Sequence, residues 1–432
     1  MAVPVQRLSH IAFHVGDSER LARDLIWRYR FHLCGRRATE RARQLVLRRG
    51  CAVFMVNESP GGQYLEPGPR GLLYDVVPAH AVDSACNVSF EVKDVERATL
   101  LLDRLGCQVL VPPRPVEDEL GAVTYSVVRS LVGNVSHTLI DRSGYRGDFL
   151  PGFGPPPSPG GRAEQGAAGG PVAITHFDHI TYACPRQQSA HIMDWYRRCF
   201  GFQRFLIHRS DDLDDGYVIE GNNQGLRLTA MEYWKCSEVG MSMPTIEEKE
   251  LNCKFVIAES LANQGKNQID TFLEQHHGAG IQHVALYTTD IVSTCKSLKD
   301  AGVHFYSPPS GYYTETVKCQ EIMKAGQDPE LLSHYGILLD SEVDDEHCKG
   351  EAKSQGPTNN KKRYLMQMFT KPIFSEDTLF LELIERKGAS GFGGGNIRAL
   401  WKSVQTCMDQ QENKKIGKEI SARNGFANDA NS

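Results

Sequence analysis

An internal repeat is the feature of this sequence that most constrains its fold. The segment CNVSFEVKDVERATLLLDRLGCQVLVPP (86–113) corresponds to QHVALYTTDIVSTCKSLKDAGVHFYSPP (282–309), and both predict a strand, an aspartate turn, a helix and another strand. LSHIAFHV (8–15) likewise corresponds to FDHITYAC (177–184), and SHTLIDR (136–142) to FLELIER (380–386). A missed repeat misassigns an entire fold, so we interpret the chain as two tandem halves before interpreting any motif.

Each half contains two modules in which a strand is followed by a helix and then by further strands. This βαβββ-type order predicts an α+β architecture with curved mixed sheets. Between the halves runs PGFGPPPSPGGRAEQGAAGGP, which has no apolar periodicity and predicts a linker. We therefore expect a first domain at 1–153, the linker at 154–172, a second domain at 173–410 and a disordered tail at 411–432.

Composition narrows the function classes. The 432 residues, 41% hydrophobic and 23% charged, are typical of an ordinary globular protein, and the net charge of −5 argues against binding to nucleic acid. The sequence contains no apolar run of about 18 residues, so we expect no transmembrane span. The 12 cysteines are scattered singly, which indicates reduced thiols in an intracellular protein and no structural zinc site. A small-molecule site is the class that remains.

The first fifty residues contain eleven Arg, no Lys and four acids. Two interpretations of this segment stay open. Its composition is typical of a mitochondrial import segment, but it also fits an Arg-rich amphipathic helix of a folded domain, from Ser18 to about Arg43, between two strands. The first interpretation predicts a mitochondrial location, and the second leaves a cytoplasmic one.

Aligning the two halves brings three ligand-type residues of the second half into equivalent strand positions. They are His179, His283 and Glu382. Two neutral imidazoles and one carboxylate form the facial triad of non-haem Fe(II) oxygenases, which leaves coordination positions open for a substrate and dioxygen. Glu382 lies between apolar neighbours, where an unpaired carboxylate would be costly. The three residues are therefore predicted to bind Fe(II).

The first half has different residues at the same positions. His10 aligns with His179, Asn87 with His283, and Thr138 with Glu382. Asn and Thr are poor ligands for a catalytic iron. The first half is therefore predicted to be a scaffold without a metal, with His10 as a core residue.

Other clusters of ligand-type residues do not predict a metal site. His276, His277 and Glu346–Cys348 lie in polar segments that are typical of loops, and His176 has no partner position in the repeat. GFGGGN (391–396) lacks the rest of the dinucleotide-binding motif, so nucleotide binding is not predicted. The segment instead predicts a flexible hinge into the following helix, which could close over a site.

Several of these motifs together resemble a known family. They are FDHITY (177–182), GIQHVALYTTDI (280–291), YLMQMFTKP (364–372), TLFLELIERKGASGFGGGNIRALW (378–401) and HTLIDRSGYRGDFLPGF (137–153). The chain resembles the 4-hydroxyphenylpyruvate dioxygenase family, of the vicinal oxygen chelate fold, from about Arg7 to Gln410. RKGASGFGGGNIRALW is closer to the bacterial hydroxymandelate synthase branch of that family.

The resemblance implies a set of roles. His179, His283 and Glu382 would hold Fe(II), the substrates would be 4-hydroxyphenylpyruvate and dioxygen, and the chain would form a homodimer. Further residues match family positions that line the substrate pocket, and Phe392 among them would pack on the substrate ring. These pocket residues are Gln268, Gln282, Gln367, Phe392 and Asn396.

The sequence departs from the family pattern at two polar positions. Leu228, in LRL, stands where the family has a serine, and Ala258, in VIAESLANQ (256–264), stands where it has an asparagine. Losing two polar groups would change how the keto acid lies in the site, and this favours 4-hydroxymandelate, a precursor of the ubiquinone head group, as the product. Homogentisate formation, an extradiol-type dioxygenase and a metal-free binding protein are the alternatives.

Overall fold

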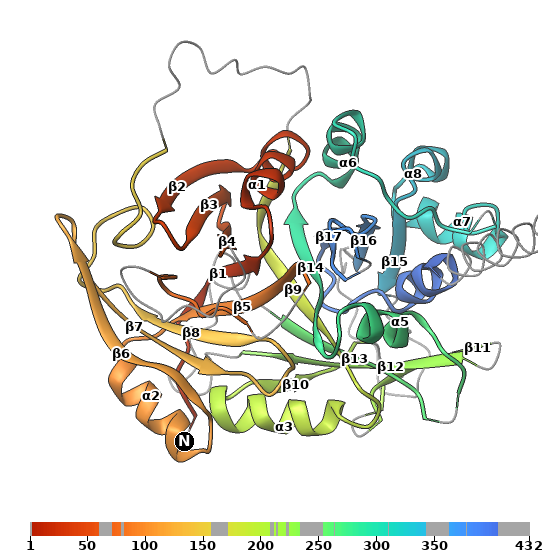
Figure 1. Cartoon of the computed structure of the whole chain (residues 1–432). Coiled ribbons are helices and arrows are strands. Elements are labelled where there is room, and N and C mark those ends of the chain that lie inside the picture. The colour runs from red at the N-terminus through yellow and green to blue at the C-terminus, as the bar shows by residue number, and fades with distance from the viewer. Residues whose placement is uncertain are drawn as a thin grey trace, which may run out of the picture.

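The computed structural model of the chain describes most of its residues. They are 2–59, 71–78, 82–156, 172–207, 211–212, 215–221, 224–233, 254–262, 264–309, 311–342, 363–376 and 378–404. The predicted linker lies largely, and the predicted tail entirely, outside this part of the chain, as does Glu346–Cys348. Figure 1 shows two curved sheets side by side, the first half in red to yellow and the second in green to blue.

The first half forms an eight-stranded sheet with strand order β2-β3-β4-β1-β5-β8-β7-β6. Helices α1 and α2 each follow the first strand of a module (Figure 1). The elements are β1 Arg7–His14, α1 Ser18–Trp27, β2 His32–Ala38, β3 Arg43–Arg49, β4 Ala52–Glu58, β5 Ser84–Glu91, α2 Val95–Arg104, β6 Val109–Asp118, β7 Gly121–Arg129 and β8 Ser136–Asp141.

The second half forms a nine-stranded sheet with strand order β10-β12-β13-β9-β14-β17-β16-β15, and β11 pairs with β12. Residues 394–404 form a further helix after β17. The other elements are β9 Ile174–Cys184, α3 Ser189–Phe200, β10 Gln203–Phe205, β11 Tyr217–Gly221, β12 Gln224–Glu232, β13 Lys254–Ser260, α5 Gln268–Gln275, β14 Gly280–Thr288, α6 Ile291–Asp300, α7 Thr316–Lys324, α8 Pro329–Tyr335, β15 Leu338–Glu342, β16 Arg363–Phe369 and β17 Phe380–Lys387.

The strand registers confirm the repeat. In the first sheet β5 runs antiparallel to β1 and parallel to β8, and β14 has the same relation to β9 and β17 in the second. Asn87 pairs with Ser136 as His283 pairs with Phe380, so Thr138 and Glu382, two residues further on, occupy equivalent positions. The predicted α+β fold of paired βαβββ modules is confirmed.

The aspartate turns of the repeat are helix N-caps. The side chain of Asp94 accepts a hydrogen bond from the backbone N–H of Arg97, and the side chain of Asp290 accepts one from Ser293. Such a cap satisfies an N–H that has no partner within the helix. The caps fix where α2 and α6 begin, and hence where the strands before them end.

The two halves share one apolar core. The ring of Phe54 on β4 lies 5.1 Å from that of Phe177 on β9, and that of Phe90 on β5 lies 6.2 Å from Phe255 on β13. The sheets therefore pack on each other through their outer faces, which leaves the concave face of each sheet free to form a site.

The Arg-rich segment is folded, but the predicted helix is too long. Helix α1 ends at Trp27, Arg30 has a left-handed backbone with φ of 61°, and residues 32–49 form β2 and β3. Leu45 and Leu47 of β3 are buried in the core. Arginine suits the exposed face of either element, so composition alone could not mark where the helix ends.

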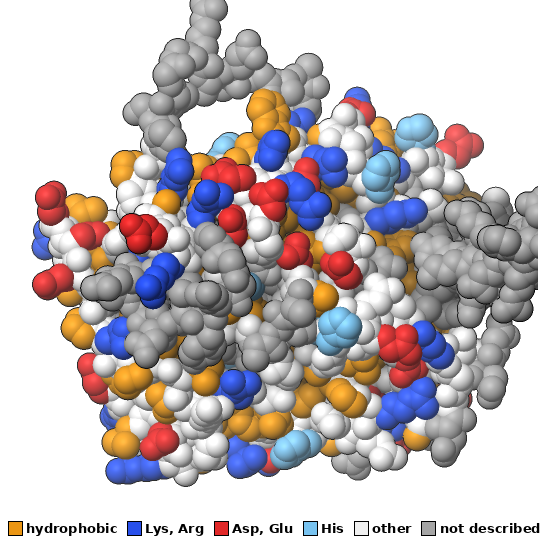
Figure 2. All heavy atoms as spheres, in the orientation of Figure 1, with side chains coloured by type: hydrophobic (Ala, Val, Ile, Leu, Met, Phe, Trp, Pro, Cys, Tyr) orange, Lys and Arg blue, Asp and Glu red, His pale blue; other side chains and the backbone are white. Residues whose placement is uncertain are grey.

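Basic and acidic side chains are interspersed on the face in Figure 2. In the described part of the chain, no helix combines the length and apolarity needed to cross a membrane.

Candidate metal centre

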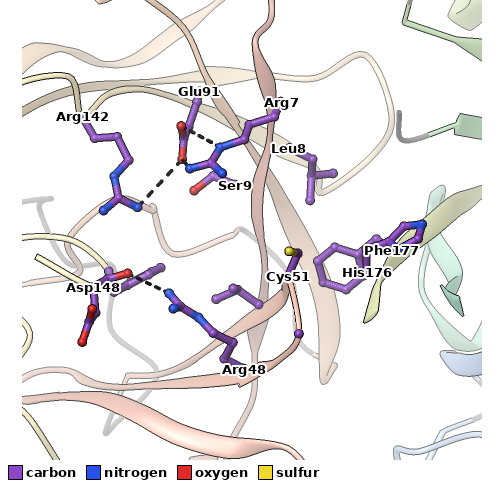
Figure 3. A pocket seen from close by; sticks show the side chains of 13 residues that line it. Arg7, Leu8, Ser9, Arg48, Cys51, Glu91, Arg142, Asp148, His176 and Phe177 are labelled. Carbon is purple, nitrogen blue, oxygen red and sulfur yellow. Dashed lines mark hydrogen bonds and ion pairs between the residues drawn. The ribbon is translucent and has the colours of Figure 1, made fainter. Parts of the chain in front are cut away.

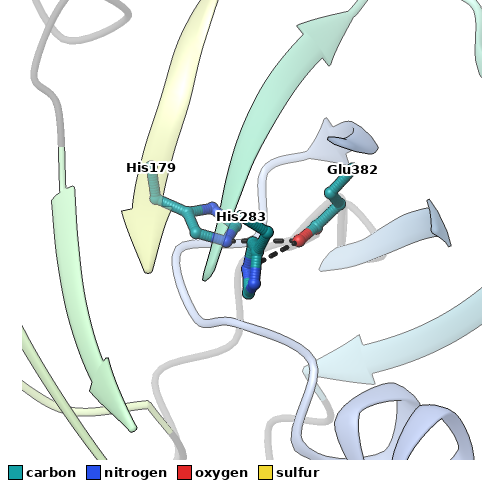
Figure 4. Close-up of side chains that lie close together, drawn as sticks. All are labelled: His179, His283 and Glu382. Carbon is teal, nitrogen blue, oxygen red and sulfur yellow. Dashed lines mark ion pairs between the residues drawn. The ribbon is translucent and has the colours of Figure 1, made fainter. Parts of the chain in front are cut away.

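Three side chains from neighbouring strands meet on the concave face of the second sheet (Figure 4). The Nε2 atoms of His179 on β9 and His283 on β14 lie 3.2 and 3.5 Å from Oε2 of Glu382 on β17. One ligand atom of each residue lies within 4.8 Å of those of the other two, and all three residues are largely buried. Two imidazoles and a carboxylate that converge in this way fit Fe(II) with open coordination positions.

His179 is oriented by a buried carboxylate. Its Nδ1 lies 2.8 Å from Oδ1 of Asp178, which turns Nε2 toward Glu382. Both oxygens of Asp178 accept hydrogen bonds of 2.7 Å from Arg386. Burial raises the pKa of Asp178, but the Arg386 guanidinium outweighs burial and holds this pKa well below its ordinary range. A carboxylate that holds the distal nitrogen of a ligand histidine is the usual support of a metal site.

The two histidines differ in their electrostatic environment. Burial lowers the pKa of His179, but the Glu382 and Asp178 carboxylates outweigh burial and raise it above its ordinary value. Burial, followed by the nearby His179, lowers the pKa of His283 far below its ordinary value. The His283 ring stacks on Phe380 at 4.7 Å. His283 is therefore held as the neutral imidazole that a metal requires.

Glu382 is held by a chain of amides and a phenol. Gln367 donates to Oε1 of Glu382 at 2.9 Å, and Asn396 donates to Gln367 at 2.9 Å. Tyr312 in turn donates to Asn396 at 2.8 Å. Gln367 thus holds the carboxylate, and Asn396 lies behind Gln367, away from the wall of the cavity where the family resemblance had placed it. The helix at 394–404 is tied to the candidate centre through Asn396.

The equivalent place in the first sheet is filled by the chain itself. Asn87 donates to Thr138 and to the carboxylate of Asp75, each at 2.9 Å. His10 is fully buried, lies 3.0 Å from the Ser89 hydroxyl through Nε2, and has a pKa lowered by burial to about 3. Asp75 comes from a segment outside the repeat, which no alignment of the halves could place there.

A cavity of about 50 Å³ opens beside the three candidate ligands. Gln268, Gln282, Gln367 and Phe392 are among the residues that line it. Its wall also contains Leu228 and Ala258, which lie directly opposite each other on β12 and β13. The two positions that depart from the family pattern thus lie side by side at the site.

Gln282 and His283 are neighbours in sequence, yet both line the cavity. A β-bulge between Ile281 and His283 interrupts the alternation of side chains along β14. Sequence reasoning missed Thr181, which also lines the cavity and whose buried Oγ1 has no hydrogen-bond partner among the described residues. Its position two residues after His179, on the same strand face, was the available signal.

His276 differs from its sequence-based interpretation as a loop residue. It is the fully buried C-cap of α5, its Nδ1 lies 2.9 Å from the Gly278 carbonyl, and its ring stacks on Phe272. Its role is therefore one of packing.

Comparison with known proteins first gives the class. A model of the Glyoxalase/Bleomycin resistance protein/Dioxygenase superfamily matches residues 176–330. A triple mutant of 4-hydroxymandelate synthase from Streptomyces coelicolor has the same fold, with a TM-score of 0.67 and 22% identity over 93% of this chain and 98% of that one. The chain has the vicinal oxygen chelate fold, with a candidate two-histidine, one-carboxylate centre.

Comparison of whole sequences then gives the family. The 4-hydroxyphenylpyruvate dioxygenase-like protein of Homo sapiens is 42% identical over 409 residues, which are 94% of this chain and 98% of that protein. The 4-hydroxyphenylpyruvate dioxygenase of Xenopus tropicalis is 29% identical over 94% of this chain and 92% of its own length. The chain belongs to the 4-hydroxyphenylpyruvate dioxygenase family, which confirms the predicted family and, with it, the predicted enzyme class of dioxygenase.

Proposed function

We propose that this chain oxidatively decarboxylates 4-hydroxyphenylpyruvate with Fe(II) and dioxygen, and that its main product is 4-hydroxymandelate. The observation that carries the proposal is the convergence of His179, His283 and Glu382 on one side of a cavity. The family membership supports the substrate, because relatives named for this keto acid match nearly the whole chain.

Fe(II) at this centre would supply a site where an α-keto acid and dioxygen are held side by side and activated. The protein's part is to hold the ligands and to orient the ring. Asp178 and Gln367 fix the orientations of His179 and Glu382. Phe392, whose ring lies 5.0 Å from that of His179, gives the aromatic substrate a packing partner.

The cavity must widen to admit this substrate. At about 50 Å³ it has room for a few water molecules. Ile397 and Leu400, from the helix at 394–404, form part of its wall. Gly393, with φ of 69°, precedes this helix, and a glycine can change its backbone angles at little cost. Movement of the helix about this hinge is our proposal for how the keto acid enters.

The preference for 4-hydroxymandelate rests on Leu228 and Ala258. Hydroxylation of the benzylic carbon gives 4-hydroxymandelate, whereas hydroxylation of the ring gives homogentisate. The choice depends on which carbon is held nearest the metal. Two apolar side chains face each other where the family resemblance implies a serine and an asparagine, so the substrate has no polar partner there to hold it for attack on the ring.

Product identification tests the proposal. The Fe(II)-loaded chain is incubated with the keto acid, and the two isomeric products are separated by chromatography. We expect 4-hydroxymandelate from the natural chain and a larger homogentisate share from Leu228→Ser with Ala258→Asn. Ala230→Ser is the control, because Ala230 is on the same strand but does not line the cavity. Homogentisate as the natural chain's main product would contradict the preference. Oxygen uptake with a catechol alone would favour an extradiol enzyme, and a chain that binds no iron would favour the metal-free alternative.

We also propose that the chain works in mitochondria, where its product would supply the ubiquinone head group. The support is the Arg-rich composition of the first fifty residues. Fractionation of cells that express the full chain tests the location, and recovery in the cytoplasm alone would contradict it.

A further inference from the structure

A second cavity lies at the junction of the two halves, away from the candidate metal centre. It measures about 260 Å³, and we call it the junction cavity. Its walls combine three arginines of the first half with apolar residues of both halves (Figure 3). The residues that matter below are Leu8, Ser9, Arg48, Arg142, Phe149 and Phe177.

Arg142 is the counterpart of Arg386 in the repeat. It follows Thr138 by four residues, as Arg386 follows Glu382. The two arginines also make the same contact five residues further along the chain: Arg142 donates to the carbonyl of Gly147, and Arg386 donates to that of Gly391. The guanidinium groups therefore have equivalent places in the two halves.

The carboxylate that pairs with this arginine in the second half is missing from the first. Asp178 accepts from Arg386 through both oxygens and from the neighbouring His179. Its counterpart is Ser9, whose Oγ lies 3.2 Å from Nδ1 of His10. The contact with the histidine is thus kept, and the carboxylate that neutralised the arginine is not.

The first half does not replace this charge fully. Glu91 forms a bidentate pair with Arg7, at 2.8 and 2.9 Å, and its oxygen comes only within 4.0 Å of Arg142. Because Glu91 is paired with Arg7, it neutralises little of the positive charge of Arg142.

Arg48 brings further positive charge into the same cavity. It donates to the backbone carbonyl of Asp148, and no ion pair with the exposed Asp148 carboxylate is found among the described residues. Its buried Nε has no acceptor within that same set. In Figure 3 the guanidinium groups of Arg48 and Arg142 lie on opposite sides of the junction cavity, and Ser9 and the Arg7–Glu91 pair also line it.

We propose that the junction cavity is a second ligand site, which binds a small organic monocarboxylate with an apolar body. The ligand carboxylate takes the place that the Asp178 side chain has in the second half, between Arg142 and Ser9, with Arg48 as a second cation. Arginine is suited to this because its planar fork matches a carboxylate. Leu8, Phe149 and Phe177 contact the apolar body of the ligand.

Isothermal titration of the full-length chain with phenylacetate tests the site, with the neutral phenylacetamide as the matched ligand. Ser9→Asp rebuilds the carboxylate of the second half and should block the site from within, and Arg142→Met removes the cation. We expect each to weaken phenylacetate binding at least tenfold. Arg146→Met is the control, because Arg146 is exposed and does not line the cavity.

Melting curves of each variant show whether weaker binding comes from loss of the site or from loss of the fold. If Ser9→Asp does not fold, the binding affinity of Arg142→Met alone tests the proposal. Phenylacetate can also enter the metal-side cavity, but neither substitution touches that cavity. Unchanged phenylacetate binding in both variants, equally tight binding of phenylacetamide, or no binding of phenylacetate to the natural chain would each overturn the proposal.

Discussion

Asp178→Asn is the substitution for which the structure makes the most detailed prediction. The carboxylate accepts one hydrogen bond from His179 and two from Arg386, all at 2.7–2.8 Å and in a buried setting. An amide of the same size removes the charge. Losing this support of a ligand histidine typically weakens metal affinity about 10- to 100-fold, or about 1.4–2.7 kcal/mol. It also leaves Arg386 buried and unpaired, which costs about 3–5 kcal/mol of stability.

The two effects can be separated with a double variant. Asp178→Asn with Arg386→Met removes both charges, so we expect it to regain much of the lost free energy of unfolding, measured by urea denaturation. It should not regain Fe(II) affinity, measured by anaerobic titration, because His179 still lacks its carboxylate. Natural Fe(II) affinity in the folded single variant would refute the reasoning, and so would full recovery of affinity in the double variant.

Three further predictions concern single side chains. Burial raises the pKa of Asp75 from 3.8 to about 7, so the folded state holds this proton more tightly than the unfolded state. The contribution of Asp75 to the free energy of unfolding should therefore fall by up to about 4 kcal/mol between about pH 4 and pH 7. Asp75→Asn should make the free energy of unfolding, measured by urea denaturation, less dependent on pH in this range. An unchanged pH dependence in this variant would contradict the prediction. Gln367→Leu removes the hydrogen-bond donor to Glu382 and should weaken Fe(II) binding about tenfold. Gln282→Leu is the control, because Gln282 lines the same cavity, and it should leave Fe(II) binding unchanged. Equal effects of the two substitutions would count against a positioning role for Gln367. Thr181→Val removes a buried hydroxyl without a partner, so it should leave the melting temperature unchanged or raised while raising KM for the keto acid; an unaltered KM would show that the hydroxyl does not face the substrate.

The sequence predicted the candidate ligands because the chain carries two copies of one fold. Asn87 occupies the position of His283 in a strand of the same shape, which shows that the fold itself needs no histidine there. Gln268, Gln367 and Phe392 were expected at the substrate pocket from the family resemblance alone, and the structure places all three in the wall of the cavity.

Features that depend on three-dimensional contacts were beyond sequence reasoning. Asp178 and Arg386 are 208 positions apart, and nothing in their local sequence pairs them. The bulge that brings Gln282 to the cavity breaks the alternation on which the prediction of strand faces relies. Asp75 reaches the equivalent site of the first half from outside the repeat, so no alignment could place it there.

The central claim is that the second half holds one Fe(II) through His179, His283 and Glu382 while the first half holds none. Metal analysis after anaerobic reconstitution and gel filtration tests it most directly, with Glu382→Ala compared to Thr138→Val at the equivalent position of the other half. We predict one iron per chain in the natural protein and in Thr138→Val, and none in Glu382→Ala. Iron retained by Glu382→Ala, or lost from a folded Thr138→Val, would contradict the claim.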